Sequence, residues 1–240
     1  MITRNELKKI KSLKLKKNRK LYSLFIAEGK KTVFELYDSN FVVHGIYSVN
    51  KIKDLDSIII SESKMSELTF LKNPSTVFGV FKLPSKPEIN MKGFVLAVDG
   101  LSDPGNLGNI IRLCDWFGIQ TLLCSESTVD CFSPKVVQST MGSLSRVNCV
   151  YGDLESFIEI SDKKIYGAVL KDGDSIYSNK FKFDSVLVLG SESHGISKKI
   201  LNKIDSKITI PKYSKSIRPE SLNVASAASI IISQFFMNTD

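Results

Sequence analysis

The sequence predicts an α/β protein with a mainly parallel sheet covered by helices on both faces, preceded by a smaller α/β domain. Strand-like apolar runs alternate with helical patterns along most of the 240 residues, as in βαβ folds. The run FVLAVDG (94–100) is almost continuously apolar, which is typical of a strand buried on both faces. The stretch LPSKPEINMKG (83–93) carries two Pro and a Gly, which interrupt periodicity and indicate a domain boundary.

Four parts are therefore expected along the chain. They are a basic segment at 1–20, a small α/β domain at 21–83, a linker at 84–93 and a large domain at 94–240. No internal repeat is present, and the only biased segment is the lysine-rich start.

Hydrophobic periodicity and capping residues place the individual elements. In the small domain we expect strands at 25–29, 42–49, 57–60 and 77–84, and helices at 30–39 and, capped by Ser61, at 62–71. In the large domain we expect strands at 94–100, 121–124, 148–151, 165–170, 185–190 and 207–211. The helices of that domain are expected at 106–117, after Ser133 and Pro134, at 154–160, near 197–204 and, capped by Ser221, at 221–236.

The charge is concentrated at the start of the chain. The net charge is +8, and residues 1–20 hold nine of the 33 Lys and Arg but only one of the 25 acidic residues. Such a segment suits a phosphate backbone, because neutralising phosphates releases counterions; a solvated tail that aids solubility is the alternative. The candidate residues for binding such a backbone are Lys8, Lys9, Lys11, Lys14, Lys16, Lys17, Arg19 and Lys20.

Several protein classes are disfavoured by composition. No apolar run approaches the roughly 18 residues that a membrane-spanning helix needs, and no signal peptide is indicated, so we expect a cytoplasmic protein. The four Cys lack CxxC spacing and only two His are present, so we expect reduced, buried thiols and no metal site. The GxGxxG pattern of dinucleotide-binding folds is absent, which leaves a nucleotide enzyme as a weak alternative.

The first candidate site segment is DPGNLGNIIRLCDWFGI (103–119). Ile110, Leu113, Cys114 and Phe117 form its apolar stripe, and Arg112 lies off that stripe. Asp103, Asn106 and Asn109 are able to cap the helix start, where anions are favoured. An Arg at such an end fits an anion site, but from this stretch alone an ordinary capped helix with a surface Arg is the favoured interpretation.

Two further segments depart from what packing alone requires. In VLGSESHGIS (188–197), a buried strand ends in a turn that holds Glu192 and His194, at the sheet edge where ligands collect. His194 is a candidate base, but a polar turn residue is the favoured interpretation. In ITIPKYSKSIRPESLNVASAASIIISQFF (208–236), the helix has a face of small residues, and Asn223 has no evident packing role.

The ordered set DPGNLGNIIR, LGSESHGIS and IP…SLNVASAA resembles the three motifs of the SpoU (TrmH-like) family of RNA ribose methyltransferases, in the SPOUT superfamily. STMGSLSRV (139–147) resembles the stretch between the first two motifs. The likeness covers about residues 94–236, and 20–83 more loosely resemble a small substrate-binding domain that precedes it.

The resemblance implies transfer of a methyl group from S-adenosylmethionine to a ribose 2′-hydroxyl of tRNA or rRNA. It also implies a C-terminal trefoil knot and a homodimer, with no membrane and no metal. The family's catalytic positions fall on Asn106, Arg112, Glu192, Ser221 and Asn223, and its cofactor-binding positions fall on Gly190, Ile210 and Leu222.

The chemistry assigns expected roles to these residues. The sulfonium donor is already activated, so the protein must mainly align the hydroxyl with the methyl carbon and manage one proton. A guanidinium stays protonated below about pH 12, so Arg112 is expected to clamp phosphate and stabilise the developing alkoxide rather than to act as the base. The other motif residues would orient the substrate and the loops.

One departure from the family pattern leaves a second function open. The family has a shorter, Gly-containing loop between IP and SLN, whereas KYSKSIRPE (212–220) is longer and has no Gly. This loop either is rebuilt around the same cofactor or fills its pocket, which would leave a catalytically inactive RNA-binding paralogue. The presence of all five motif residues favours the enzyme.

Overall fold

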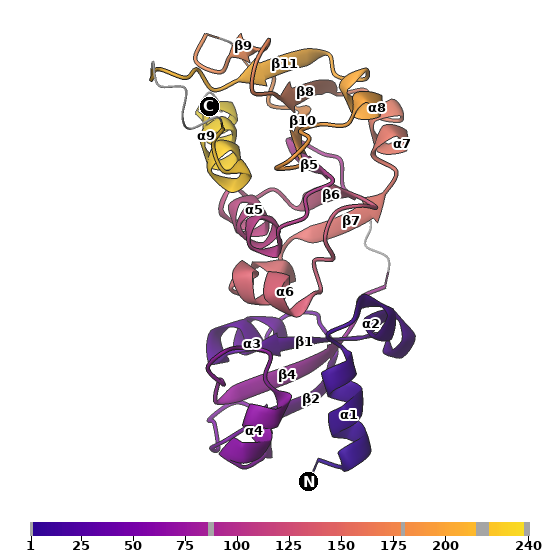
Figure 1. Cartoon of the computed structure of the whole chain (residues 1–240), viewed down its shortest axis with the longest axis vertical. Coiled ribbons are helices and arrows are strands. Elements are labelled where there is room, and N and C mark those ends of the chain that lie inside the picture. Colours follow the sequence, from indigo (N-terminus) through magenta and orange to yellow (C-terminus); the bar gives the residue numbers. More distant parts are fainter. Residues whose placement is uncertain (1, 86–88, 179–180, 215–220, 238–240) are drawn as a thin grey trace. The chain divides into compact units, whose positions relative to one another are not determined.

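The computed structural model of the chain describes residues 2–85, 89–178, 181–214 and 221–237 (Figure 1). It divides into two compact units, Met1–Lys86 with Asp130–Arg146, and Pro87–Val129 with Val147–Asp240. Whereas the sequence predicts continuous domains, a segment from the middle of the chain, with α6 (Pro134–Thr140) and η1 (Ser143–Ser145), belongs to the first unit.

The first unit is a four-stranded sheet with helices on both faces. The strand order is β1 (Leu24–Glu28), β4 (Val77–Lys82), β2 (Val43–Ser48) and β3 (Ile58–Ile59), with only the β2–β3 pair parallel. α1 (Arg4–Ser12) and α4 (Glu62–Leu68) cover one face, because their apolar side chains share a core with Leu24 and Ile26. α3 (Lys30–Tyr37) covers the other face, where Phe25 also packs on Phe132, with ring centroids 4.9 Å apart.

The basic segment is folded rather than a tail. It forms α1 and α2 (Lys16–Tyr22), and the side chains of Ile10 and Leu13 are fully buried. The sequence did not predict these helices, because lysines outnumber the few apolar residues that anchor them.

The second unit contains a parallel seven-stranded sheet. Its order is β7 (Asn148–Gly152), β6 (Thr121–Ser125), β5 (Val95–Asp99), β10 (Ser185–Gly190), β8 (Lys164–Ala168), β11 (Ser206–Thr209) and β9 (Asp174–Ser175). All six neighbouring pairs run parallel. Except for the two-residue β9, each strand lies where the apolar runs predict it.

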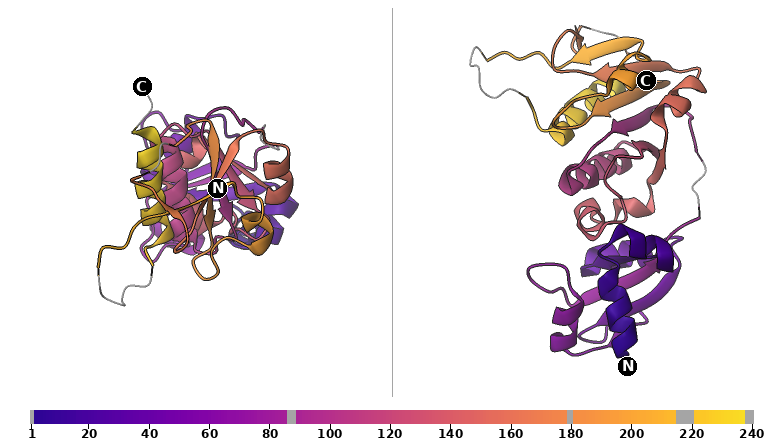
Figure 2. Two further views of the ribbon diagram at one scale, coloured as in Figure 1. Left: turned by 90° about the horizontal axis from the view of Figure 1, so that it is seen from above. Right: turned by 45° about the vertical axis from the view of Figure 1, so that its right-hand side comes forward.

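Helices cover both faces of this sheet, as the alternating pattern predicts (Figures 1 and 2). α5 (Pro104–Trp116) and α9 (Val224–Phe236) pack together on one face. α7 (Leu154–Glu159) and α8 (Lys198–Leu201) lie on the other, where Leu154, Ile158 and Ile200 share a core with strand side chains. α8 is shorter than the helix predicted near 197–204.

The predicted cap of the last helix is wrong by two residues. α9 begins at Val224 with Asn223 as its N-cap, and the Asn223 Oδ1 accepts hydrogen bonds from the N–H groups of Ala225 and Ser226. Ser221 lies outside the helix and is exposed. An Asn side chain caps as well as Ser does, so the sequence alone did not decide between them.

Candidate functional site

The three motif segments meet because of the strand order. β5 and β10 are parallel neighbours, and Gly190 at the end of β10 lies opposite Asp99 at the end of β5. The segments that leave these strands therefore start at one edge of the sheet, where ligands collect in open α/β folds. The third segment joins them because it leads into α9, which packs against α5.

Glu192 joins the second segment to the first. Its Oε1 accepts hydrogen bonds from Asn106 Nδ2 at 2.9 Å and from the N–H of Asp103 at 3.4 Å. Its Oε2 accepts from the N–H of Ser102 at 3.4 Å and from the Ser102 hydroxyl at 3.5 Å. The carboxylate is thus held against the N-terminal end of α5, where negative charge is favoured.

These contacts set the charge state of Glu192. Partial burial raises the pKa of its carboxyl, but hydrogen bonds from the Asn106 side chain and from backbone N–H groups favour the ionised form. The net result is a pKa below the ordinary value. Glu192 is therefore an ionised acceptor that holds the turn, rather than a carrier of protons.

Asn106 joins the first segment to the third. Its Nδ2 donates to Glu192, and its Oδ1 accepts a hydrogen bond from Asn223 Nδ2 at 2.9 Å. Asp103 caps α5 by accepting from the N–H of Asn106 at 2.8 Å. Asn106, Glu192 and Asn223 thus form one chain of hydrogen bonds, which we call the motif network, drawn from three separated parts of the sequence.

Arg112 lies two turns into α5 and is exposed. It makes no hydrogen bond or ion pair with any residue in the described part of the chain. Trp116 follows one turn later on the same helix and is 85% exposed. The guanidinium is therefore available to a ligand, and the structure does not join it to the motif network.

The remaining predicted residues flank the network. Gly190 ends β10, and a Cβ there would lie 2.1 Å from the backbone of Gly195, so only glycine allows the following turn to fold back. Ile210 directly follows β11 and is partly exposed, while Ser221 and Leu222 directly precede Asn223. Most of the long loop, residues 215–220, lies outside the described residues.

Sequence reasoning missed Ser102, which donates from both its backbone and its hydroxyl to Glu192. Its position just after a buried strand and before the Pro-Gly turn was the available signal. It also missed the bond between the Ser193 hydroxyl and His194 Nδ1, 2.7 Å long.

The candidate RNA-binding residues differ in how far they are exposed. Arg19 is only 3% exposed; it pairs with Asp130 at 2.6 Å and donates to the carbonyls of Leu13 and Lys14. The guanidinium of Arg19 is therefore used within the fold. Lys9 is half-buried, with its Nζ 5.4 Å from the ring centroid of Tyr22. The other lysines, all exposed, are Lys8, Lys11, Lys14, Lys16, Lys17 and Lys20.

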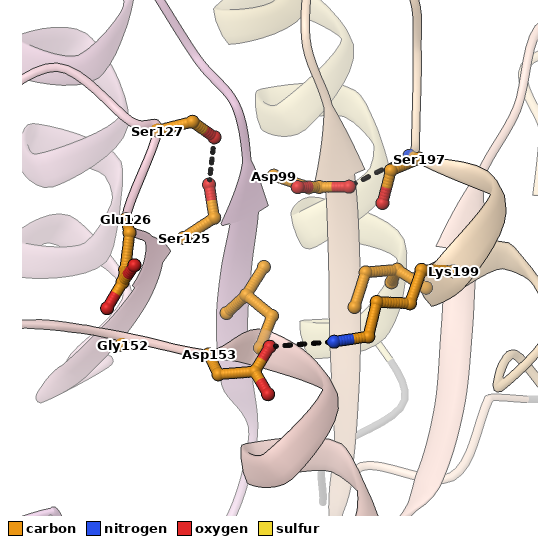
Figure 3. Close-up of a pocket in the computed structure, with 10 residues that line it drawn as sticks. Asp99, Ser125, Glu126, Ser127, Gly152, Asp153, Ser197 and Lys199 are labelled. Carbon is orange, nitrogen blue, oxygen red and sulfur yellow. Dashed lines mark hydrogen bonds and ion pairs between the residues drawn. The ribbon is translucent and has the colours of Figure 1, made fainter.

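A hollow of about 330 Å³ lies at the carboxyl ends of β5, β6 and β7 (Figure 3). None of the predicted catalytic or cofactor-binding residues lines it. Two hydrogen bonds join residues of its lining: Lys199 Nζ donates to Asp153 Oδ1 at 3.4 Å, and the Asp99 carboxylate accepts from the backbone N–H of Ser197 at 2.8 Å. The second contact ties the end of β5 to the start of α8, which gives Asp99 a structural role.

The cysteines and the helices of the described residues bear on other kinds of site. None of the four Cys forms a disulfide; Cys114, Cys124 and Cys131 are buried, whereas Cys149 is partly exposed. Among the described residues, no helix is long and apolar enough to cross a membrane, and no His, Cys, Asp and Glu cluster could hold a metal ion.

Comparison with known proteins identifies both parts of the chain. Residues 93–233 match the SpoU rRNA Methylase family, and residues 4–79 match the MRM3-like substrate binding domain. The 23S rRNA (guanosine(2553)-2'-O)-methyltransferase RlmP of Bacillus subtilis is 30% identical over 232 residues, which cover 92% of each chain.

Solved structures agree with this match. A protein described as a TrmH-family RNA methyltransferase, from Porphyromonas gingivalis, is 34% identical with a TM-score of 0.86 and 98% coverage of both chains. An AdoMet-bound rRNA methyltransferase from Sinorhizobium meliloti is 25% identical with a TM-score of 0.87, covering 100% of this chain and 97% of that one. The family match spans more than half of the residues, and this chain therefore belongs to the SpoU rRNA methylase family.

Proposed function

We propose that this protein transfers a methyl group from S-adenosylmethionine to a ribose 2′-hydroxyl of tRNA or rRNA. The observation that carries the proposal is the motif network, in which Asn106, Glu192 and Asn223 are hydrogen-bonded in one place. The B. subtilis relative is named as a 23S rRNA 2'-O-methyltransferase, and the S. meliloti relative was solved with AdoMet bound. An inactive paralogue receives no support from these relatives.

The residues around the network fit an adenosyl cofactor. Leu222 is 48% exposed and Ile210 is partly exposed, so apolar side chains remain available beside polar turns. An adenine ring needs such a combination of apolar surface and backbone polar groups. We propose that Gly190, Ile210 and Leu222 hold the cofactor, which supplies an activated methyl group when bound.

The protein's own residues would then align the substrate. The motif network holds the three segments in register, which is the alignment that methyl transfer requires. Arg112, exposed and without a partner among the described residues, is proposed to bind an RNA phosphate through its planar fork and to stabilise negative charge on the hydroxyl oxygen. Ser221 is proposed to orient the loop that precedes α9.

The exposed lysines of α1, of α2 and of the turn between them support an RNA substrate. We propose that they bind the phosphate backbone without reading its sequence. By the family resemblance we also propose a C-terminal trefoil knot, a homodimer and a cytoplasmic location. Trp116 supports the dimer, because so large an apolar side chain gains from burial against a second copy.

Methyl transfer to RNA tests the proposal directly. Ribosomal RNA and tRNA from cells that lack the protein are incubated with it and with S-adenosylmethionine, and 2′-O-methylated positions are mapped. We expect methylation at a defined position and at least a 10²-fold lower rate for Arg112→Ala. Near-normal turnover of Arg112→Ala at saturating cofactor would remove Arg112 from the mechanism.

Calorimetric titration separates the enzyme from an inactive binder. We expect S-adenosylmethionine to bind the wild-type protein, alone or with RNA present. Absence of binding in both conditions would favour an RNA-binding protein whose pocket is filled.

A further inference from the structure

The hollow at the carboxyl ends of β5, β6 and β7 lies outside the motif network and has the character of a ligand site. Its volume of about 330 Å³ falls at the lower end of the range of about 300–1,000 Å³ that is usual for ligand pockets. The buried side chains of Leu154 and Ile200 supply apolar lining, and polar groups at three strand ends complete it. The hollow therefore suits a small ligand with an apolar face and a polar edge, such as one nucleobase.

Three hydroxyls at the hollow form a directed chain of hydrogen bonds (Figure 3). Thr128 Oγ1 donates its single proton to the carbonyl of Val98 at 3.3 Å, so the Ser125 hydroxyl, 3.0 Å away, donates to Thr128. Ser125 Oγ accepts the N–H of Gly100 at 2.8 Å, and the Ser127 hydroxyl, at 3.0 Å, then donates to it as well. Because its proton is used in this way, Ser127 is left to accept a hydrogen bond from a ligand.

Two carboxylates of the lining also keep unused acceptor atoms. Glu126 is exposed, and within the described part of the chain its carboxylate makes no hydrogen bond or ion pair. Asp99 is only 9% exposed; its Oδ2 accepts the N–H of Ser197, whereas its Oδ1 makes no hydrogen bond with any residue that the structure describes. Lys199, which also lines the hollow, already pairs with two carboxylates of the segment that opens α7. The hollow thus offers a ligand mainly hydrogen-bond acceptors.

A ligand for such a lining must present N–H donors. Guanine has two of them side by side on its Watson–Crick edge, at N1 and at the 2-amino group, whereas adenine and cytosine offer one amino group and uracil one N–H. A carboxylate accepts two parallel N–H groups at once. Proteins that recognise RNA sequence commonly read unstacked bases along this edge. Guanine is therefore the RNA base that matches the hollow best.

The hollow adjoins the turn that holds Glu192. A Cβ at Gly100 would lie 3.5 Å from Ser127 Oγ and 3.8 Å from Ser191 Cβ, so the lining and the turn meet at the same glycine. Ser102, which donates to Glu192, follows two residues later. A base in the hollow would therefore belong to the same short stretch of RNA as a ribose at the motif network.

We propose that the hollow is a specificity site that binds a guanine base of the RNA, at or directly beside the nucleotide whose ribose is methylated. This inference rests on the proposed function. Glu126 accepts hydrogen bonds from N1–H and from the 2-amino group, and Ser127 accepts the second hydrogen of that amino group. The hollow selects and positions the RNA and takes no part in the transfer of the methyl group.

Inosine tests the identity of the base, because it keeps N1–H but lacks the 2-amino group. In an RNA that the wild-type protein methylates, guanosine at the methylated position and at each neighbouring position is replaced singly by inosine. We expect kcat/KM to fall about 10-fold at one of these positions. The absence of guanosine from all of these positions, or an unchanged kcat/KM for every inosine RNA, overturns the proposal.

Glu126→Gln tests the residue. An amide has one acceptor oxygen where the carboxylate has two, so we expect kcat/KM for the guanosine RNA to fall about 10-fold and the preference over inosine to disappear. Both proteins meet the same two RNAs, so a change in RNA folding does not explain a lost preference. The matched control Asp162→Asn removes an exposed carboxylate just before β8, at the opposite edge of the sheet, and should keep the wild-type rate and preference.

The outcomes separate the two proposals. A preference for guanosine that persists in Glu126→Gln, or an equal loss in Asp162→Asn, overturns the role of the hollow and leaves the methyltransferase intact. Loss of cofactor affinity in Glu126→Gln, measured by calorimetry, assigns Glu126 to the structure of the sheet edge and likewise overturns this inference. A wild-type protein that methylates no RNA overturns the proposed function, and this inference with it.

Discussion

At the residue scale, the side chain of Asn223 makes two kinds of hydrogen bond. It caps α9 through its Oδ1 and donates to Asn106 through its Nδ2. Because losing an N-cap costs about 1 kcal/mol, Asn223→Ala should lower the free energy of unfolding by about that amount in urea denaturation. Ser221→Ala is the matched control, since Ser221 caps nothing; an equal loss for both variants would contradict the cap assignment.

The lowered pKa of Glu192 makes a prediction about pH. Because its folded-state pKa lies below the ordinary value of 4.5, its contribution to stability is fully present above about that pH. It is lost as the pH falls through the folded-state pKa. The difference in unfolding free energy between the wild type and Glu192→Gln, measured from pH 3 to 6, should therefore shrink toward acid. A difference that grows toward acid would contradict the lowered pKa.

The type of a residue does not reveal whether its side chain is buried, as Arg19 shows. In the sequence it resembles the seven lysines around it, but its guanidinium is buried against Asp130. Removing one member of a buried ion pair strands the other charge, so Arg19→Ala should destabilise the first unit by about 3 kcal/mol. Thermal and urea unfolding measure this loss, and Lys20→Ala, which changes an exposed neighbour, should have little effect.

At the element scale, the charge of α1 and α2 is separable from their folding role. Deleting residues 1–20 would remove buried Ile10 and Leu13 as well as the lysines, so substitution is the cleaner test. Lys8, Lys11 and Lys14, changed together to Gln, should weaken RNA binding and reduce the slope of log affinity against log salt by about 2. A matched triple change at exposed Lys51, Lys53 and Lys72 should leave that slope unaltered. If both triple variants reduce the slope equally, RNA is attracted by the overall positive charge rather than bound by these helices.

Sequence patterns predict these elements unevenly, for physical reasons. Strands such as β5 and β10 are predictable because burial on both faces demands an unbroken apolar run. α1 and α2 are not, because only a few apolar side chains fix them. Of the candidate site, residue types alone suggest anion binding near Arg112, and the family resemblance supplies the rest. The bonds among Asn106, Glu192 and Asn223 depend on strand order, which no local pattern contains.

At the scale of the whole molecule, the single Trp reports on assembly. Trp116 is 85% exposed, and the chain has no other Trp, so its fluorescence belongs to one position on α5. If two copies associate through this helix, dilution should shift the emission to longer wavelength as the dimer separates. Trp116→Ala should raise the dissociation constant in sedimentation experiments. Emission that does not change across the monomer–dimer transition would place the interface elsewhere.

Because residues 130–146 belong to the first unit, the folding of that unit depends on the order in which the chain is synthesised. On a ribosome, Phe25 and Arg19 emerge long before Phe132 and Asp130, the side chains they later meet. A nascent polypeptide that ends at residue 86 lacks residues 130–146. It should therefore expose the apolar surface that these residues cover, and bind chaperones. Its N-terminal part should become protease-resistant only after residue 146 has left the exit tunnel.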